Sequence, residues 1–331
     1  MSNGTAWKRL LVQVEKRNVL DVQLANSTFS ESLFSENGYY EQNDHIEELE
    51  SLFLQAELQW VGSSSSFHNF AVDLSTAGRN HSACIVLENG LSEYPCSVDL
   101  LGDYLKYGVE DMRWEQCEKY YRDLIALDRS DWNWRAYSFS IDYLLEKRKR
   151  AISAEERRGL RDEVLKLAKA FVKREESDLA FFDLSNVYGE LNKKAEEKAT
   201  LSLAISKSGF SPRCSLRLAD LEISAGNYSQ ALERLKVCQT SLKPQSDINL
   251  AYVYLLKMLC ESSIMLSNIL DGSMDKPSIE ENANAIYRDY NSAYKIGLDS
   301  IMLKTANAVI AVIENQTGVR NNMGSSDAQG F

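Results

Sequence analysis

The chain has 331 residues and a net charge of −11, and its hydrophobic fraction of 44% excludes a wholly disordered protein. The acidic balance disfavours a general nucleic-acid binder, because affinity for phosphate comes mainly from basic surface. Only 4 prolines and 16 glycines occur, which favours helices with short connections over a turn-rich β-sandwich or barrel.

The amino-terminal region is expected to precede a helical domain. Residues 1–43 are ambiguous between helix, strand and linker. The spacing Asp44-x-x-Glu47 is typical of a capping box, and apolar residues at helical spacing from Ile46 to Trp60 predict a helix that caps the domain. Met1–Leu11 lacks the apolar run of a signal peptide, and the chain has no uninterrupted apolar stretch of about 18 residues, so no membrane span is expected.

The six cysteines lie far apart in the sequence, at positions 84, 96, 117, 214, 238 and 260. No C-x-x-C pair occurs, so neither a zinc site nor a redox motif is expected. Cys84, Cys117 and Cys238 fall at core positions and are expected to be buried thiols. Together these features indicate a cytoplasmic protein with reduced cysteines and no metal.

From residue 64 onward the chain repeats one pattern of aromatic, large and small residues. The pattern is first seen in Phe67, Phe70, Ala71, Leu74, Gly78, Ala83, Leu87, Gly90 and Pro95. It returns in Leu218, Ala219, Gly226, Tyr228, Ala231, Leu235 and Pro244. Small residues suit the closest approach of two antiparallel helices, and glycine can end the first helix in the left-handed conformation.

The repeats begin near residues 64, 98, 131, 178, 212 and 246, at intervals of 34, 33, 47, 34 and 34. The long third interval holds about 13 extra residues, around 146–159. The period and its residues resemble the tetratricopeptide repeat family, best at residues 67–95 and 215–244. The resemblance implies an all-α fold, a right-handed superhelical array of antiparallel helix pairs with about six repeats and capping helices. That domain would span residues 44–317, with a last helix at Ile301–Ile313 and a disordered tail at 318–331.

The resemblance also implies a concave groove, lined by the first helix of each pair, that binds a peptide or a helix. Arg213 and Arg217 share one face of such a helix, and Asn186 and Arg135 lie on equivalent helices. These side chains suit a ligand with a carboxylate, although two arginines on a solvated helix face are the alternative. In the first case Arg217→Ala weakens binding by about tenfold and leaves stability almost unchanged.

A basic insertion coincides with the extra residues of the third repeat. Its cationic side chains are Lys147, Arg148, Lys149, Arg150, Arg157 and Arg158. Between residues 146 and 174 there are 11 Lys and Arg against 5 acids. Three interpretations remain: a solvated loop and helix start, a surface that docks an acidic protein, or a site for RNA or anionic lipid. The interleaved acids weigh against RNA.

No motif for catalysis occurs in the sequence. The P-loop, the nucleophile elbow, the H-E-x-x-H zinc motif and the dinucleotide-binding glycines are all missing, and His45, His68 and His81 are the only histidines. A metal shared by His68 and His81 is a minor alternative to ordinary histidines. The clustered aromatic residues Trp114, Tyr120, Tyr121, Trp132 and Trp134 are read as packing between repeats rather than as a base-stacking surface.

The sequence therefore predicts a protein without catalytic activity or cofactor. Its expected role is that of an adaptor or regulatory subunit whose partner is another protein or a peptide, acidic if the arginines bind it. Two alternatives stay open: RNA binding through the basic insertion, and a ligand-sensing regulator of a partner effector.

Overall fold

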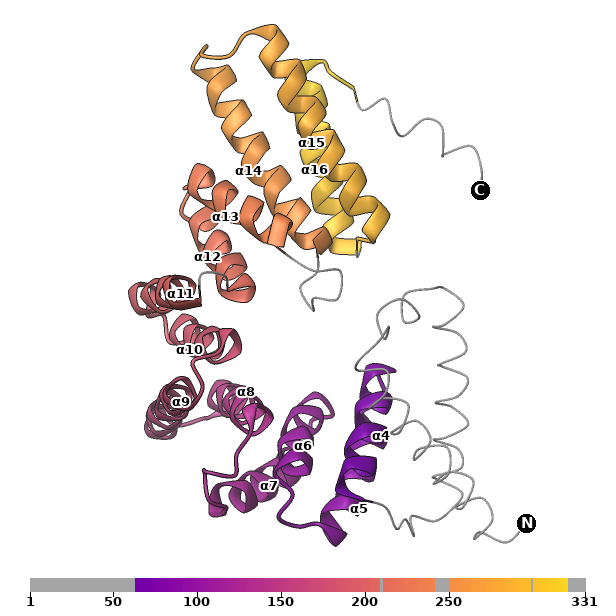
Figure 1. Cartoon of the computed structure of the whole chain (residues 1–331), viewed down its shortest axis with the longest axis vertical. Helices are drawn as coiled ribbons and strands as arrows, with labels where there is room; N and C mark the ends of the chain where they lie inside the picture. The colour runs from indigo at the N-terminus through magenta and orange to yellow at the C-terminus, as the bar shows by residue number, and fades with distance from the viewer. Residues whose placement is uncertain (1–62, 209–210, 242–249, 299, 321–331) are drawn as a thin grey trace, which may run out of the picture. The chain divides into compact units, whose positions relative to one another are not determined.

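The computed structural model describes residues 63–208, 211–241, 250–298 and 300–320 (Figure 1). These ranges contain thirteen α-helices and no β-strand. In chain order they are α4 (Ser64–Thr76), α5 (Asn80–Glu93), α6 (Val98–Glu110), α7 (Trp114–Ala126), α8 (Trp134–Arg150), α9 (Ala154–Arg174), α10 (Asp178–Glu190), α11 (Lys194–Ser208), α12 (Pro212–Ser224), α13 (Tyr228–Ser241), α14 (Leu250–Leu270), α15 (Lys276–Ile296) and α16 (Ser300–Thr317). The predicted helix at 46–60, residues 1–43 and the tail beyond 320 lie outside the described residues.

The helices occur in the predicted pairs. The first helix of each pair begins at Ser64, Val98, Trp134, Asp178, Pro212 and Leu250, within four residues of the starts expected from the period. The small residues of the repeat (Ala71, Ala83, Ala219 and Ala231) are fully buried. The all-α solenoid of helix pairs is therefore confirmed, and close helix contact at alanine is the reason these positions stay small.

The turns within the pairs are made by residues with left-handed backbone conformation. Gly78 and Gly226 end their helices with φ of 75° and 78°. Met112 and Asn192 occupy the same place in other pairs, with φ of 59° and 56°. Glycine adopts this conformation without steric cost, whereas a residue with a Cβ does not.

The chain divides into two compact units. The first contains α4 to α9 together with Asn186–Asn192, and the second contains Ser177–Ser185 and the chain from Lys193. In the first unit Phe67, Phe70 and Leu74 of α4 are fully or almost fully buried. Trp132, just before α8, is also fully buried, as its expected role in packing requires.

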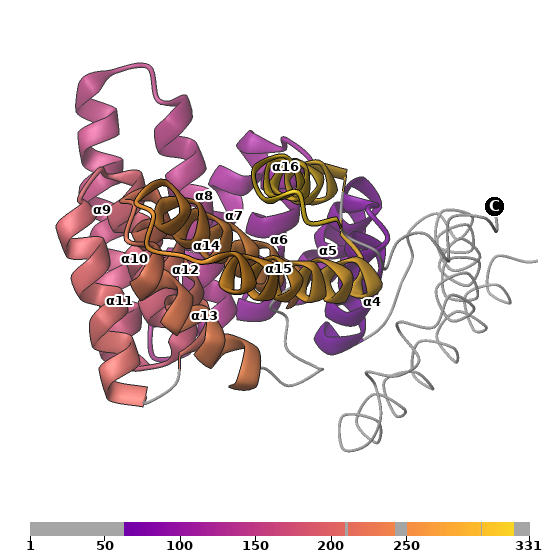
Figure 2. The same ribbon diagram turned by 90° about the horizontal axis from the view of Figure 1, so that it is seen from above.

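The basic insertion of the sequence is built as two long helices and not as a loop. Helix α8 has 17 residues and α9 has 21, whereas α6 and α7 have 13 each. Figure 2 shows α8 and α9 running side by side to a short connection at residues 151–153. Ser153 begins α9 as its N-cap by accepting a hydrogen bond from the backbone N–H of Glu156. Residues 151–159 are thus a short connection and a helix start, as one of the three interpretations expected, whereas residues 146–150 belong to the end of α8.

The second unit ends in three long helices, α14, α15 and α16, which lie against one another (Figure 1). One face of α14 packs with α12 and α13 around Leu235 and Cys260, and another packs with α15 and α16 around Ile286 and Ile313. By length and composition alone α14 is apolar enough to cross a membrane, with a mean hydropathy of 1.3, and 39% of that window is buried. This finding differs from the expectation of no such segment, although a core helix passes the same test.

Candidate interaction surfaces

The four residues predicted to line a groove all lie on first helices of pairs. Arg135 on α8 and Asn186 on α10 belong to the first compact unit. Arg213 and Arg217 are one turn apart on α12 in the second. The structure thus places two of the four on one helix and the other two on separate helices.

Both arginines of α12 contact carboxylates of the same unit. Arg217 donates to Glu197 of α11, with Nη2 2.8 Å and Nε 2.9 Å from Oε1. Glu197 is 1% exposed, so this ion pair neutralises a buried charge. Arg213 lies 3.8 Å from Asp178 of α10. Because Arg217 pairs with this buried carboxylate, we expect its removal to cost stability, whereas the sequence alone predicted almost no change.

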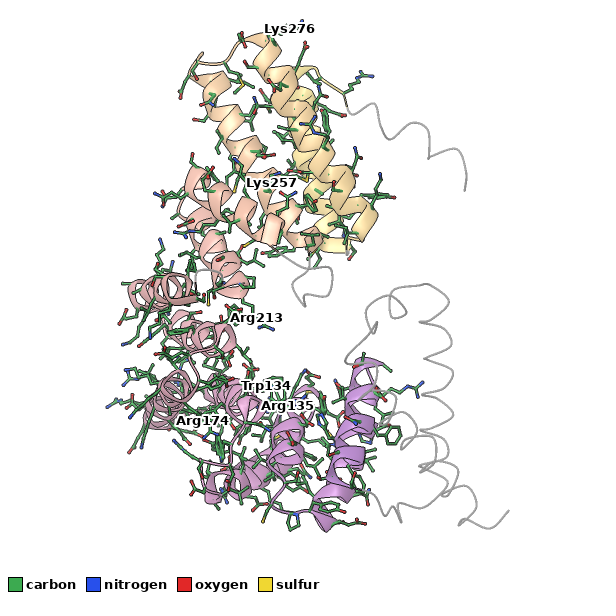
Figure 3. The ribbon with its side chains drawn as sticks, viewed as in Figure 1. Trp134, Arg135, Arg174, Arg213, Lys257 and Lys276 are labelled. Carbon is green, nitrogen blue, oxygen red and sulfur yellow. The ribbon has the colours of Figure 1, made fainter. Side chains whose placement is uncertain are left out.

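The first unit carries an exposed cluster of aromatic and cationic side chains on its first helices, here called the α6–α8 face. Trp134 and Arg135 are neighbours at the start of α8 (Figure 3). Arg135 stacks over the ring of Trp134 at 4.7 Å and lies 3.7 Å from Asp99. Phe139 meets Trp134 edge to face, and the Lys106 ammonium lies 5.2 Å from the Phe139 ring. Trp134 is 40% exposed, so it is not the interior packing residue that the sequence suggested.

Lys106 and Phe139 were not among the predicted site residues. A cation–π contact between two helices depends on how neighbouring helix pairs pack. The spacing of residues along a single helix therefore does not predict it. The signal available in the sequence was Trp134 itself, a large aromatic residue at the start of a first helix, next to an arginine. An exposed aromatic residue with flanking cations is typical of a protein-binding surface.

The basic residues of the third repeat gather where α8 ends and α9 begins, here called the α8–α9 tip (Lys147–Arg158). Two of its cations are paired within the first unit: Lys147 with Glu118, and Lys149 with Glu146 at 2.8 Å. Arg157 donates to the carbonyl of Ile152 at 3.3 Å. Basic residues in the last turn of α8 also match the negative end of the helix dipole.

An open pocket of about 220 Å³ lies beside this tip. It is lined by Trp114, Glu118, Tyr143, Lys147, Arg150, Ala151, Ile152 and Glu156. The Arg150 guanidinium stacks over the Trp114 ring at 4.3 Å, and Ile152 at the connection is 94% exposed. The lining therefore combines four apolar or aromatic residues with two cations and two carboxylates.

Glu118 fixes one wall of this pocket. The Tyr143 hydroxyl donates to Glu118 Oε2 at 2.6 Å, and Lys147 donates to the same oxygen. Burial alone would raise the pKa of Glu118, but the hydrogen bonds from Lys147 and Tyr143 outweigh it and lower that pKa to about 2. The carboxylate stays ionised and holds α7 against α8.

The two histidines of the first pair contact different carboxylates. His68 Nδ1 bonds to Asp103 of α6, which is 1% exposed, and burial raises the pKa of that carboxyl group. His81 Nδ1 lies 3.1 Å from Asp111, which also accepts from Arg113. Within the described ranges no three His, Cys, Asp or Glu side chains are grouped so as to hold a metal ion.

No family model and no curated protein matches this sequence. Among solved structures, the chain is similar to a tetratricopeptide repeat protein from Parabacteroides merdae. The two share 11% identity over 92% of this chain and 99% of that one, with a TM-score of 0.55. A thermophilic tetratricopeptide repeat protein from Thermus thermophilus matches at 18% identity, over 61% of this chain and 99% of that one, with a TM-score of 0.48.

These findings identify the chain first as an all-α protein of repeated helix pairs. More particularly, its fold is that of the tetratricopeptide repeat proteins, as the period, the buried alanines and the structural match together show.

Proposed function

We propose that this protein is a non-catalytic adaptor or regulatory subunit, located in the cytoplasm, that binds a segment of another protein on its first helices. The observation that carries the proposal is the α6–α8 face. Trp134 is 40% exposed with Arg135 stacked on it, and tryptophan and arginine are the side chains that most often dominate binding energy at protein interfaces.

The chemistry of this face indicates what it binds. Arg135 and Lys106 lie against aromatic rings, which orient them without neutralising their charge. Asp99 is 3.7 Å from Arg135, a distance that leaves much of the guanidinium available to an acidic side chain. A partner segment with an apolar residue next to a carboxylate fits such a surface.

RNA binding remains the second candidate function, because Arg148, Arg150 and Arg158 contact no carboxylate among the described residues. The net charge of −11 and the acids between these cations make it the weaker of the two. The third candidate function is that of a ligand-sensing regulator of a partner effector.

The test is a photo-crosslink from a defined position on the face. Asp142 is exposed on α8, one turn beyond Phe139, and is replaced by p-benzoylphenylalanine in the full chain. After irradiation in native lysate we expect a protein adduct, identified by mass spectrometry, that disappears when Trp134→Ser is added. Nuclease treatment should leave that adduct unchanged.

The matched control carries the same crosslinker at Lys166, which is exposed on the second helix α9. It should not capture the protein trapped from position 142. Equal capture from both positions, or an adduct that nuclease removes, would contradict binding by the first helices.

A further inference from the structure

We propose that the α8–α9 tip is a second docking surface, which binds an acidic segment of a partner protein and seats one apolar side chain in the pocket beside Trp114. This inference rests on the proposed protein-binding function but concerns a different part of the first unit. It is built from the pocket, the cations at its edge and the acids that line it.

The pocket has the size and lining for a single apolar side chain. Its volume of about 220 Å³ is below that of a site for a drug-sized ligand, which is roughly 300–1,000 Å³. A cavity of roughly 150 Å³ is enough to hold a benzene ring. Ile152 is 94% exposed at the pocket edge, an isolated apolar side chain that an incoming residue would cover.

The tip carries four arginines, and one of them, Arg150, lines the pocket. Among the described residues, Arg148, Arg150 and Arg158 form no ion pair, whereas Lys147 and Lys149 both do. Arg150 is also held in place by its stacking on Trp114. A stacked guanidinium loses less conformational entropy on binding, and its N–H groups remain available to a carboxylate. The tip is therefore preorganised for an acidic ligand.

The same geometry argues against nucleic acid and lipid at this site. Glu118 and Glu156 line the pocket, and a phosphate placed there would meet both carboxylates. Arg150 covers one face of Trp114, which removes that face as a stacking platform for a base. A peptide avoids both conflicts, because its apolar side chain enters the pocket while its own carboxylates stay outside with the arginines.

The experiment is a selection of random twelve-residue peptides, displayed on phage, against the full-length protein. Each selection is repeated on a variant with Arg148→Ser, Arg150→Ser and Arg158→Ser. We expect enriched peptides with Asp and Glu flanking one large apolar residue. Their affinity should fall at least tenfold on this variant and at least fivefold on Ile152→Ser.

A matched control removes three exposed cations of α9 that lie outside the tip, as Lys166→Ser, Lys169→Ser and Lys173→Ser. It changes the net charge equally and should leave peptide affinity within twofold. Melting temperatures and circular dichroism of each variant confirm that it is folded. A loss of affinity in the control equal to that in the arginine variant would overturn the proposal, because it would mean non-specific attraction.

Three other results would also overturn the proposed docking surface. Failure to enrich any peptide that distinguishes the native chain from the arginine variant overturns the docking surface. Peptides lost on Trp134→Ser but kept on the arginine variant overturn it as well, and they leave the proposed function of the α6–α8 face intact. An anionic single-stranded oligonucleotide, or vesicles with acidic lipid, that outcompete the selected peptides at equal charge would assign the tip to those ligands instead.

Discussion

At the scale of single residues, the second unit depends on buried carboxylates that are each held by one arginine. Glu197 is 1% exposed and pairs with Arg217, and Glu222 is 5% exposed and accepts from Arg234 Nε at 2.9 Å through both oxygens. Removing one partner of such a pair leaves a buried charge uncompensated. The sequence showed that Arg213 and Arg217 share a face, but it did not show that Glu197 of the preceding pair reaches that face.

We therefore expect Arg217→Met to lower the free energy of unfolding by about 1–3 kcal/mol, because Glu197 loses its charged partner. Urea denaturation of the full chain measures this change. Adding Glu197→Gln should recover part of the loss, since the buried group is then neutral. An unchanged unfolding midpoint in Arg217→Met would show that the pair contributes nothing and that the guanidinium is free for a ligand.

Glu118 gives the protein one defined source of acid sensitivity. Its folded-state pKa, about 2, lies below the ordinary value of 4.5, so its stabilising contribution is present above about pH 4.5 and is lost as pH falls toward 2. Glu118→Gln should cost about 1–3 kcal/mol at pH 7, and the difference from the native chain should shrink steadily below pH 5.

Equilibrium unfolding in urea between pH 7 and pH 3 follows that difference. Glu115→Gln, at an exposed carboxylate on the same helix, is the control and should show no such dependence. A destabilisation by Glu118→Gln that stays constant with pH would mean that the charge of Glu118 is not what holds α7 to α8.

At the scale of elements, the turns show where the sequence predicts the structure well and where it does not. Gly78 and Gly226 were expected to end first helices and do so. Met112 and Asn192 make the same turn without glycine, and no sequence motif predicts their left-handed conformation. The long third interval, of 47 residues, showed where the inserted residues lie in the sequence. It did not show that they extend α8 and α9; they do so because lysine and arginine are good helix formers and Ser153 caps α9.

Met112→Gly should raise the free energy of unfolding by about 1 kcal/mol. The residue is 73% exposed, so little packing is lost, and glycine relieves the steric cost of its positive φ. Asn192→Gly should gain less, because asparagine tolerates the left-handed conformation better than methionine. Thermal unfolding of both variants measures the order, and a destabilised Met112→Gly would contradict the turn geometry.

At the scale of the whole molecule, stability comes from helix pairs that bury their apolar faces against neighbours. The period predicted this arrangement because each repeat carries its own small and large core positions, such as Ala231 and Leu235, both fully buried. It did not predict the α6–α8 face or the pocket at the α8–α9 tip, which depend on side chains from helices that are distant in sequence. The pattern within one repeat predicts which residues are buried in the core. The packing of one helix pair on the next determines which exposed side chains come into contact.

Deletion of residues 178–211 removes one complete pair and should leave a shorter, soluble and helical protein, because the flanking pairs present matching faces. Deletion of residues 194–211 alone removes α11 and exposes the apolar residues that it covers, so we expect aggregation. Size-exclusion chromatography and circular dichroism distinguish the two. Equal solubility of both deletions would show that the pair is not the structural unit.

Hydrogen–deuterium exchange of the full chain, with and without the partner captured by the photo-crosslink, measures whether this protein binds another protein through its first helices. We predict slower exchange in peptides that cover residues 98–110 and 134–150 when the partner is bound, and little change in α9 beyond residue 160. Protection confined to residues outside these two segments, or no protection at saturating partner, would contradict it.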